Sequence, residues 1–289
     1  ELWIKRFEDL HGCDFADLAY TKLSDEEIRK FVNAPSILSL TRRETRAMDV
    51  LRIMRTPEYL FWAAKILLNL DLMPTHAIIL EELWTRLNPM LIAARGAAKS
   101  FMLAVYILLR MRLVPNSKIM VCGTALRQSK FIFQYAVGIW KNADILRSTM
   151  DKNDGPTTAI DRCTFTIGDS VTNFIPIGLG HTIRGFRANV TITDEFNSLT
   201  PEIYETVIKG FGAVSKDPVK KARSFAKRQK LIQTGEWSTE KEANFVRGQG
   251  NQAIITGTCG YSFENFARYY NNYKKIIEGE HEEPGIHRS

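Results

Sequence analysis

Apolar residues recur at helical spacing through the first part of the chain, which shows no convincing strand before residue 88. Segment 14–32 has this spacing, and its Ser24 and Glu27 resemble a capping box. Segment 57–70 also fits a helix, with Pro57 near its start. We therefore expect residues 1–70 to form a helical N-terminal lobe that belongs to a small lid subdomain.

From Asn88 onward, short apolar runs alternate with longer helical patterns. This alternation predicts an α/β fold in which a mainly parallel sheet is flanked by helices. We expect the core to span residues 71–262, and residues 263–289 to form a C-terminal helix and the start of a linker. A hairpin is expected between two runs near residue 168, with Asp169 and Ser170 at its turn. The expected strands lie in segments 88–94, 118–124, 163–168, 171–178, 189–196 and 252–260.

Amino-acid composition excludes few functional classes for this protein. The net charge of +7 and the pI near 9.2 are a mild lean toward polyanionic partners. The four cysteines are far apart and form no C-x-x-C pair, which indicates reduced thiols and not a disulfide or metal framework. The longest apolar run, residues 101–109, is too short to span a bilayer, so no membrane partner is expected.

Residues 91–100, LIAARGAAKS, resemble the phosphate-loop pattern G-x-x-x-x-G-K-[ST]. Lys99 and Ser100 are in place, whereas Ala93 and Ala98 occupy the two glycine positions. The setting fits, because an apolar run precedes the loop and a helix is expected from Lys99. Gly96, and not Ala93, is predicted to carry any positive φ in the turn. A plain strand–turn–helix with an exposed lysine is the alternative.

In the phosphate-loop interpretation, Lys99 would reach the β and γ phosphates of ATP, and Ser100 would bind Mg²⁺ through its hydroxyl. The backbone of the preceding turn would wrap the phosphates. The residues of that turn are Ala94, Arg95, Gly96, Ala97 and Ala98.

A second motif places Asp194 and Glu195 directly after the β-branched run 190–193. In strand–loop ATPases, an acid at this position holds Mg²⁺ through water, and the next acid activates the attacking water. Because the pair follows a lysine–serine loop by roughly a hundred residues, we assign Asp194 to Mg²⁺ and Glu195 to catalysis. The alternative is an acidic pair that caps a helix beginning near Pro201.

Two arginines extend this interpretation. Arg95 lies in the loop, where its guanidinium group can make a bidentate contact with the γ phosphate or pair with Glu195. Arg184 lies between Gly180 and Gly185, eleven residues before Glu195, where it can serve a neighbouring subunit's nucleotide as an arginine finger. A solvated side chain or a structural ion pair is the alternative for each arginine.

The densest basic cluster lies in segment 215–230. It predicts contacts with the phosphate backbone of double-stranded DNA, without base readout. The alternative is a solvated helix or a flexible insertion. The residues assigned to DNA binding are Lys220, Lys221, Arg223, Lys227 and Arg228.

Together, these motifs resemble the ATPase domain of viral large terminase subunits, the motors that package DNA into procapsids. The resemblance rests on ARGAAKS, on TIRGFRANVTITDE and on IITGTCGY, and it spans residues 70–262. It implies a P-loop NTPase fold of the ASCE type, with Arg95 as a sensor of the γ phosphate and Arg184 as a trans-acting finger. Thr256, Gly257 and Thr258 would couple nucleotide state to motion.

His76 occupies the position where this family carries an adenine-contacting glutamine, so it would contact adenine or simply pack. The resemblance also implies partners: double-stranded DNA, the portal protein, the small terminase subunit and further copies in a ring. The expected location is the host cytoplasm, with transient docking on the procapsid portal.

No nuclease activity is expected, because the segment after Gly260 is too short for the family's nuclease domain. Two alternatives to a packaging motor remain at this stage. One is a helicase-like ATPase of the same fold class, and the other is a nonenzymatic DNA- or portal-binding module with a vestigial nucleotide site.

Overall fold

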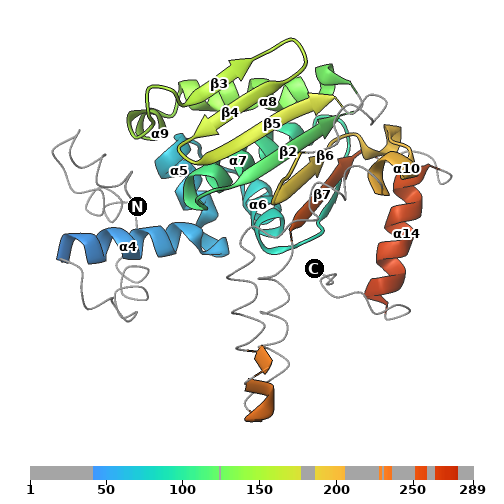
Figure 1. Cartoon of the computed structure of the whole chain (residues 1–289), viewed down its shortest axis with the longest axis horizontal. Helices are drawn as coiled ribbons and strands as arrows, with labels where there is room; N and C mark the ends of the chain where they lie inside the picture. The colour runs from blue at the N-terminus through green and yellow to red at the C-terminus, as the bar shows by residue number, and fades with distance from the viewer. Residues whose placement is uncertain are drawn as a thin grey trace.

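A computed structural model describes most of the predicted core of this chain (Figure 1). The N-terminal capping box of Ser24 and Glu27 lies outside the described residues, and so does Arg184. The described ranges are 42–123, 125–176, 186–205, 228–229, 231–235, 251–258 and 264–278.

Seven strands in these ranges form one sheet, in the order β1-β7-β6-β2-β5-β4-β3. The pairs from β1 through β5 are parallel, whereas β5, β4 and β3 pair antiparallel. This confirms the predicted mainly parallel sheet. The strands are β1 (Met90–Ile92), β2 (Lys118–Gly123), β3 (Gly155–Thr158), β4 (Cys163–Ile167), β5 (Ser170–Pro176), β6 (Val190–Thr193) and β7 (Gln252–Gly257).

The helices lie on both faces of the sheet. Alternate residues of β2 reach two different cores: Ile119 and Val121 join the larger cluster, and Met120 and Cys122 join the smaller one. A strand buried on both faces reads as a continuous apolar run, as β2 does. The helices are α4 (Arg42–Arg55), η1 (Pro57–Tyr59), α5 (Leu60–Leu68), α6 (Pro74–Thr85), α7 (Lys99–Leu113), α8 (Leu126–Lys141), α9 (Asp144–Ser148), η3 (Phe196–Ser198), α10 (Pro201–Ile203) and α14 (Asn265–Ile277).

The larger cluster packs α4 to α8 against one face of the sheet. The smaller cluster brings η3, α10 and α14 to the other face, and Figure 1 shows α10 and α14 together beyond β6 and β7. Aromatic rings hold this second layer, since Phe196 lies 4.8 Å from Tyr204 and 5.0 Å from Tyr269, measured between ring centroids. Within the described ranges, no helix is long and apolar enough to cross a bilayer.

Two details of the antiparallel part differ from the sequence-based expectation. Strand β3 was not predicted, because its sequence GPTT has only weak β character. The turn of the β4–β5 hairpin consists of Gly168 and Asp169, with Gly168 at φ +54. Ser170 already belongs to β5 and pairs with Ile167, so its assignment to the turn was wrong by one residue.

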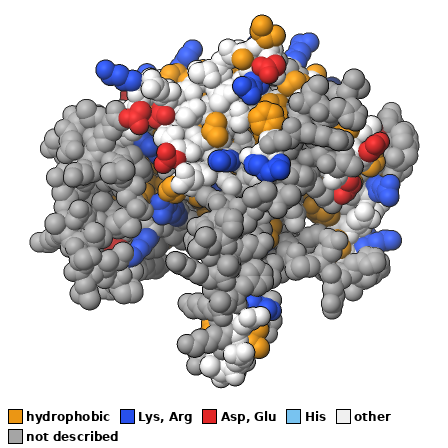
Figure 2. Space-filling model, viewed as in Figure 1, with side chains coloured by type: hydrophobic (Ala, Val, Ile, Leu, Met, Phe, Trp, Pro, Cys, Tyr) orange, Lys and Arg blue, Asp and Glu red, His pale blue; other side chains and the backbone are white. Residues whose placement is uncertain are grey.

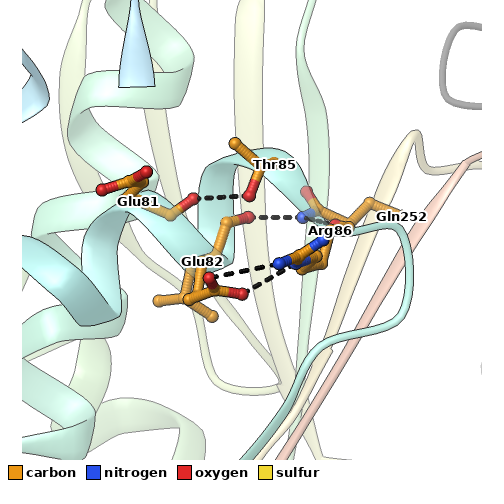
Figure 3. Close-up of polar contacts among 6 residues, drawn as sticks. Glu81, Glu82, Thr85, Arg86 and Gln252 are labelled. Carbon is orange, nitrogen blue, oxygen red and sulfur yellow. Dashed lines mark hydrogen bonds and ion pairs between the residues drawn. The ribbon is translucent and has the colours of Figure 1, made fainter. Parts of the chain in front are cut away.

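A buried amide joins the sheet to two helices. Gln252, the first residue of β7, donates from Nε2 to the carbonyl oxygens of Leu83 (2.5 Å) and Arg86 (2.6 Å). Its Oε1 accepts a hydrogen bond from the Tyr106 hydroxyl of α7. Figure 3 shows the neighbouring end of α6, where Arg86 Nε pairs with Glu82 Oε2 at 2.8 Å. Gln252 thus satisfies orphan carbonyl groups at the C-terminus of α6 and fixes the approach to β1.

Candidate nucleotide-binding site

The predicted motifs meet at one edge of the sheet. Strands β1, β7 and β6 are parallel neighbours, and the register pairs Ile92 with Gly257 and Thr193 with Ile255. The segments that leave their carboxyl ends are therefore side by side, at the edge where parallel α/β sheets bind ligands. Strand β7 lies between the strand before the loop and the strand before the acidic pair. This inserted strand is the arrangement of the ASCE type of P-loop fold.

The loop between β1 and α7 is anchored to β7 by its backbone. The amide of Ala93 donates to the carbonyl oxygen of Gly257 at 3.3 Å, and the amide of Ala97 donates to that of Ala94 at 3.3 Å. Gly96 has φ +82, as predicted, and Ala93 is not left-handed. However, Ala98 is also left-handed, with φ +56. The turn therefore keeps its shape at the second glycine position even though the residue is an alanine.

The two left-handed residues give opposite predictions for stability. Ala98→Gly should stabilise the fold by about 1 kcal/mol, because it removes the strain of a left-handed alanine and loses part of that gain to unfolded-state entropy. Gly96→Ala should destabilise it by about 1 kcal/mol, through backbone strain alone, since an added Cβ at Gly96 meets nothing within 4 Å. Urea unfolding midpoints would show opposite shifts, and two shifts of the same sign would contradict the assigned dihedrals.

Lys99 is buried, with 9% of its surface exposed. Its Nζ donates to the carbonyl oxygens of Ala93 (2.8 Å) and Ala94 (3.1 Å), so the ammonium group is folded back into the loop. Within the described part of the chain it has no ion pair. Lys99 is therefore not the exposed lysine of the alternative interpretation, and a buried positive charge lies at the start of α7, where an anion would be stabilised.

Asp194 and Glu195 each accept a hydrogen bond from a threonine at the carboxyl end of β7, Thr256 within the strand and Thr258 directly after it. Thr256 Oγ1 donates to Asp194 Oδ1 at 2.7 Å, and Thr258 Oγ1 donates to Glu195 Oε2 at 3.1 Å. Asp194 is buried, whereas Glu195 is partly exposed and left-handed, with φ 50. A residue other than glycine is strained in the left-handed backbone conformation, and such strain concentrates at functional sites.

Neither acid caps a helix in the structure. Glu195 precedes η3 but makes no side-chain capping bond, and α10 is preceded by Thr200, also without one. The capping alternative for the acidic pair is thus wrong. The threonine bonds could not be read from the sequence, because they depend on the pairing of β6 with β7.

Burial raises the pKa of Asp194 above its ordinary value of 3.8, and the charge of Glu195 raises it further, while the hydrogen bond from Thr256 and the charge of Lys99 act in the opposite direction. Between the unfolded-state and folded-state pKa values the folded chain binds more protons, so stability falls as the pH rises through this window. Desolvation of an incompletely paired carboxylate is the cause.

Asp194→Asn is therefore expected to raise the unfolding free energy by about 1–2 kcal/mol at pH 7. An amide keeps the oxygen that accepts from Thr256 and removes the buried charge. The gain should shrink as the pH falls, because a growing fraction of the aspartate is then protonated and uncharged. Thermal unfolding of both proteins at pH 4 to 8 would measure this, and a gain that does not depend on pH would contradict the assignment.

Gly257 is a point of close approach between the two strand ends and the second helical layer. A Cβ added there would lie 3.2 Å from a ring carbon of Phe266 and 3.4 Å from Asn197 Oδ1. Its carbonyl oxygen meanwhile receives the amide of Ala93. Gly257 therefore touches both the loop and α14, and a side chain would push α14 away from the site.

The donor set fits a magnesium–triphosphate group. Three groups lie at the same sheet edge, namely a buried ammonium, a hydroxyl in the first turn of α7 and a buried carboxylate. They belong to Lys99, Ser100 and Asp194. The described residues contain no cluster of three or more His, Cys, Asp or Glu side chains that could hold a metal by themselves. Mg²⁺ is commonly held by one or two carboxylates together with phosphate oxygens, and this site provides for that.

The remaining predicted residues are only partly placed. Arg95 is exposed and makes no ion pair with Glu195. The ring of His76 lies 6.1 Å from that of Phe101, which is a packing contact. Arg228 lies in the short described helical segment 228–229. Four of the predicted DNA-binding residues lie outside the described ranges, namely Lys220, Lys221, Arg223 and Lys227.

Solved structures that resemble this fold include phage large terminases and a phage DNA packaging ATPase. The HK97 bacteriophage large terminase gives a TM-score of 0.45 at 12% identity, with 73% of this chain and 38% of that chain covered. The large terminase ATPase domain of Thermus phage P74-26 gives 0.42 at 12% identity, with 71% and 72% covered. The N-terminal domain of the bacteriophage phi29 DNA packaging ATPase gives a TM-score of 0.38 at 12% identity, with 65% of this chain and 81% of that chain covered.

No protein-family model and no curated protein matches the sequence. The chain spans 38% of the length of the HK97 large terminase.

Proposed function

We propose that this chain hydrolyses Mg²⁺–ATP as the motor that translocates double-stranded DNA into a viral procapsid, the role of a terminase large subunit ATPase domain. One observation carries the proposal. The buried ammonium of Lys99 and the Asp194–Glu195 pair meet at one sheet edge, where Thr256 and Thr258 tie the acids to the strand that anchors the loop.

Each residue of the site has a distinct task. Lys99 and the backbone amides of residues 94–100 bind the phosphates, and Ser100 and Asp194 hold Mg²⁺, Asp194 through water. Mg²⁺ supplies charge neutralisation at the phosphate oxygens. Glu195 accepts the proton of the attacking water, and the bond from Thr258 fixes the orientation of its carboxylate. Positioning and electrostatics account for most of the catalysis of phosphoryl transfer.

Two arginines complete the proposed site. Arg95 is exposed in the loop and free to turn onto the γ phosphate, where its planar fork matches the phosphate oxygens. Arg184 acts on the nucleotide of a neighbouring subunit, which makes a homo-oligomeric ring part of the proposal. The strand end at Thr256 to Thr258 couples nucleotide state to motion, since Thr258 and Gly257 contact Glu195 and the loop.

DNA binding is assigned to the cluster of Lys220, Lys221, Arg223, Lys227 and Arg228. The described side chains visible in Figure 2 carry both charge signs, and Lys and Arg do not gather into one patch there. The density of positive charge in segment 215–230 suits contacts with the phosphate backbone. The further proposed partners are the portal protein and the small terminase subunit, in host cytoplasm and at the procapsid portal.

Phosphate release from ATP, measured with and without duplex DNA, tests this function. We expect hydrolysis that depends on Mg²⁺ and that DNA stimulates. In a separate DNA-binding measurement, changing Lys220, Lys221 and Arg223 to alanine should weaken the salt dependence of binding, because fewer counterions are released. Absence of hydrolysis in the presence of DNA would favour the nonenzymatic module instead. Duplex unwinding in place of translocation would favour the helicase-like alternative.

A further inference from the structure

A pocket of about 560 Å³ opens between α7, α8 and the segment that follows α5. Phe101 lines it, and Phe101 directly follows Ser100 in the first turn of α7. Phe101 therefore links the pocket to the helical turn that carries Lys99 and Ser100. Its size lies within the range of small-molecule sites.

The pocket carries an aromatic surface. Phe131 and Tyr135, one helical turn apart on α8, line the pocket and are 48% and 49% exposed. The Tyr135 ring meets the Phe101 ring edge-on, with centroids 6.1 Å apart. Single exposed aromatic residues are common, but here three rings border one cavity. Exposed ring faces are suited to stacking with a planar base.

A glycine forms part of the pocket wall. Gly138 lies within α8, three residues after Tyr135, and a Cβ added there would meet nothing within 4 Å. Glycine destabilises a helix interior relative to alanine, so neither helix formation nor packing accounts for it. A larger side chain at this position would have room to project into the pocket.

Polar specificity can come from one side chain. Gln134 lines the same pocket and is exposed. A glutamine amide offers one donor group and one acceptor, which matches the amino group and ring nitrogen of adenine. His76 is not among the lining residues, and its contact with the Phe101 ring is a packing contact.

We infer that this pocket binds the base and ribose of the nucleotide, with adenine stacked on Tyr135 and Phe131 and read by Gln134. The inference rests on the proposed function, because the phosphates of the same nucleotide occupy the loop that ends at Ser100. The segment from the loop through Phe101 to α8 then forms one continuous nucleotide site.

Binding of two probes by the intact chain tests the inference separately from the phosphate site. The probes are a non-hydrolysable ATP analogue and inorganic tripolyphosphate, both with Mg²⁺, measured by calorimetry. A Phe131→Ala, Tyr135→Ala double variant should bind the ATP analogue about tenfold more weakly or worse, and tripolyphosphate unchanged. Phe61→Ala, which removes a 44% exposed aromatic residue that does not line the pocket, is the matched control.

Gly138→Leu provides a second variant that fills the pocket without removing a packing contact. Its melting temperature should not fall, because the added side chain has room, while its affinity for the ATP analogue should fall and that for tripolyphosphate should not. Unchanged affinity for the ATP analogue in both variants would overturn the inference. An unaltered chain that binds neither probe would instead overturn the proposed nucleotide site, and this inference with it.

Discussion

Replacing Glu195 with glutamine is expected to slow ATP hydrolysis by about 100- to 10,000-fold, the usual contribution of a positioned general base. Nucleotide binding should remain nearly unchanged. Glutamine keeps the size of the side chain and an oxygen that can accept from Thr258, but it cannot take up the proton of the attacking water. Phosphate release and ATP-analogue binding, measured on the same preparation, separate the two effects.

The matched control is Glu58→Gln, which changes an exposed glutamate of η1 away from the acidic pair. Thr258→Val is a graded test, because it leaves the carboxylate in place and removes its hydrogen bond. We expect a fall in turnover that is smaller than for Glu195→Gln. If the glutamine variant hydrolyses ATP at the normal rate, Glu195 is not the catalytic base.

Replacing Lys99 with alanine is expected to weaken nucleotide binding by about 30- to 5,000-fold, which corresponds to the loss of about 2–5 kcal/mol for one partner of a buried charge pair. The ammonium group now donates to two carbonyl oxygens of the loop, and it can transfer these bonds to phosphate oxygens without a large movement. Hydrolysis at low ATP concentration should fall at least as far.

The same substitution has a second, smaller consequence for stability. It leaves the carbonyl oxygens of Ala93 and Ala94 without this donor, which should cost about 1–3 kcal/mol if water does not replace it. Lys130→Ala, at an exposed position on α8, is the control for loss of a positive charge. Tripolyphosphate binding that survives in the Lys99 variant would contradict the role given to this residue.

The parallel half of the sheet could be predicted from the sequence because its strands are buried on both faces. Continuous apolar runs such as that of β2 then stand out between amphipathic helices. The loop and the acidic pair were also predictable, since each requires particular residue types at fixed spacing after a strand. Their juxtaposition followed from the rule that parallel strands share one carboxyl edge.

The remaining features depend on tertiary pairing and could not be read locally. Strand β3 is polar because it lies at the edge of the sheet, where one side needs no apolar residues. The left-handed alanine at position 98 follows from the geometry of the turn before α7, which overrides the intrinsic preference of the residue. Gln252 begins β7, and its amide donates to two carbonyl groups more than 160 residues away in sequence.

The site also shows how function opposes stability. Two buried charged groups, Lys99 and Asp194, and two left-handed residues, Ala98 and Glu195, lie within a few residues of the same sheet edge. The buried carboxylate of Asp194 and the two left-handed residues each destabilise the free protein by roughly 1–3 kcal/mol, whereas Lys99 is partly compensated by its hydrogen bonds to the loop carbonyl groups. Because bound phosphates and Mg²⁺ would compensate both charges, nucleotide binding should raise the melting temperature of this chain.

The most direct test of the site is a structure of the chain crystallised with Mg²⁺ and a non-hydrolysable ATP analogue. We predict that Lys99 Nζ leaves the carbonyl oxygens of Ala93 and Ala94 and binds phosphate oxygens, with Mg²⁺ on the Ser100 hydroxyl and the Glu195 carboxylate facing the terminal phosphate. A nucleotide bound elsewhere, with Lys99 still held by the loop carbonyls, would contradict the account.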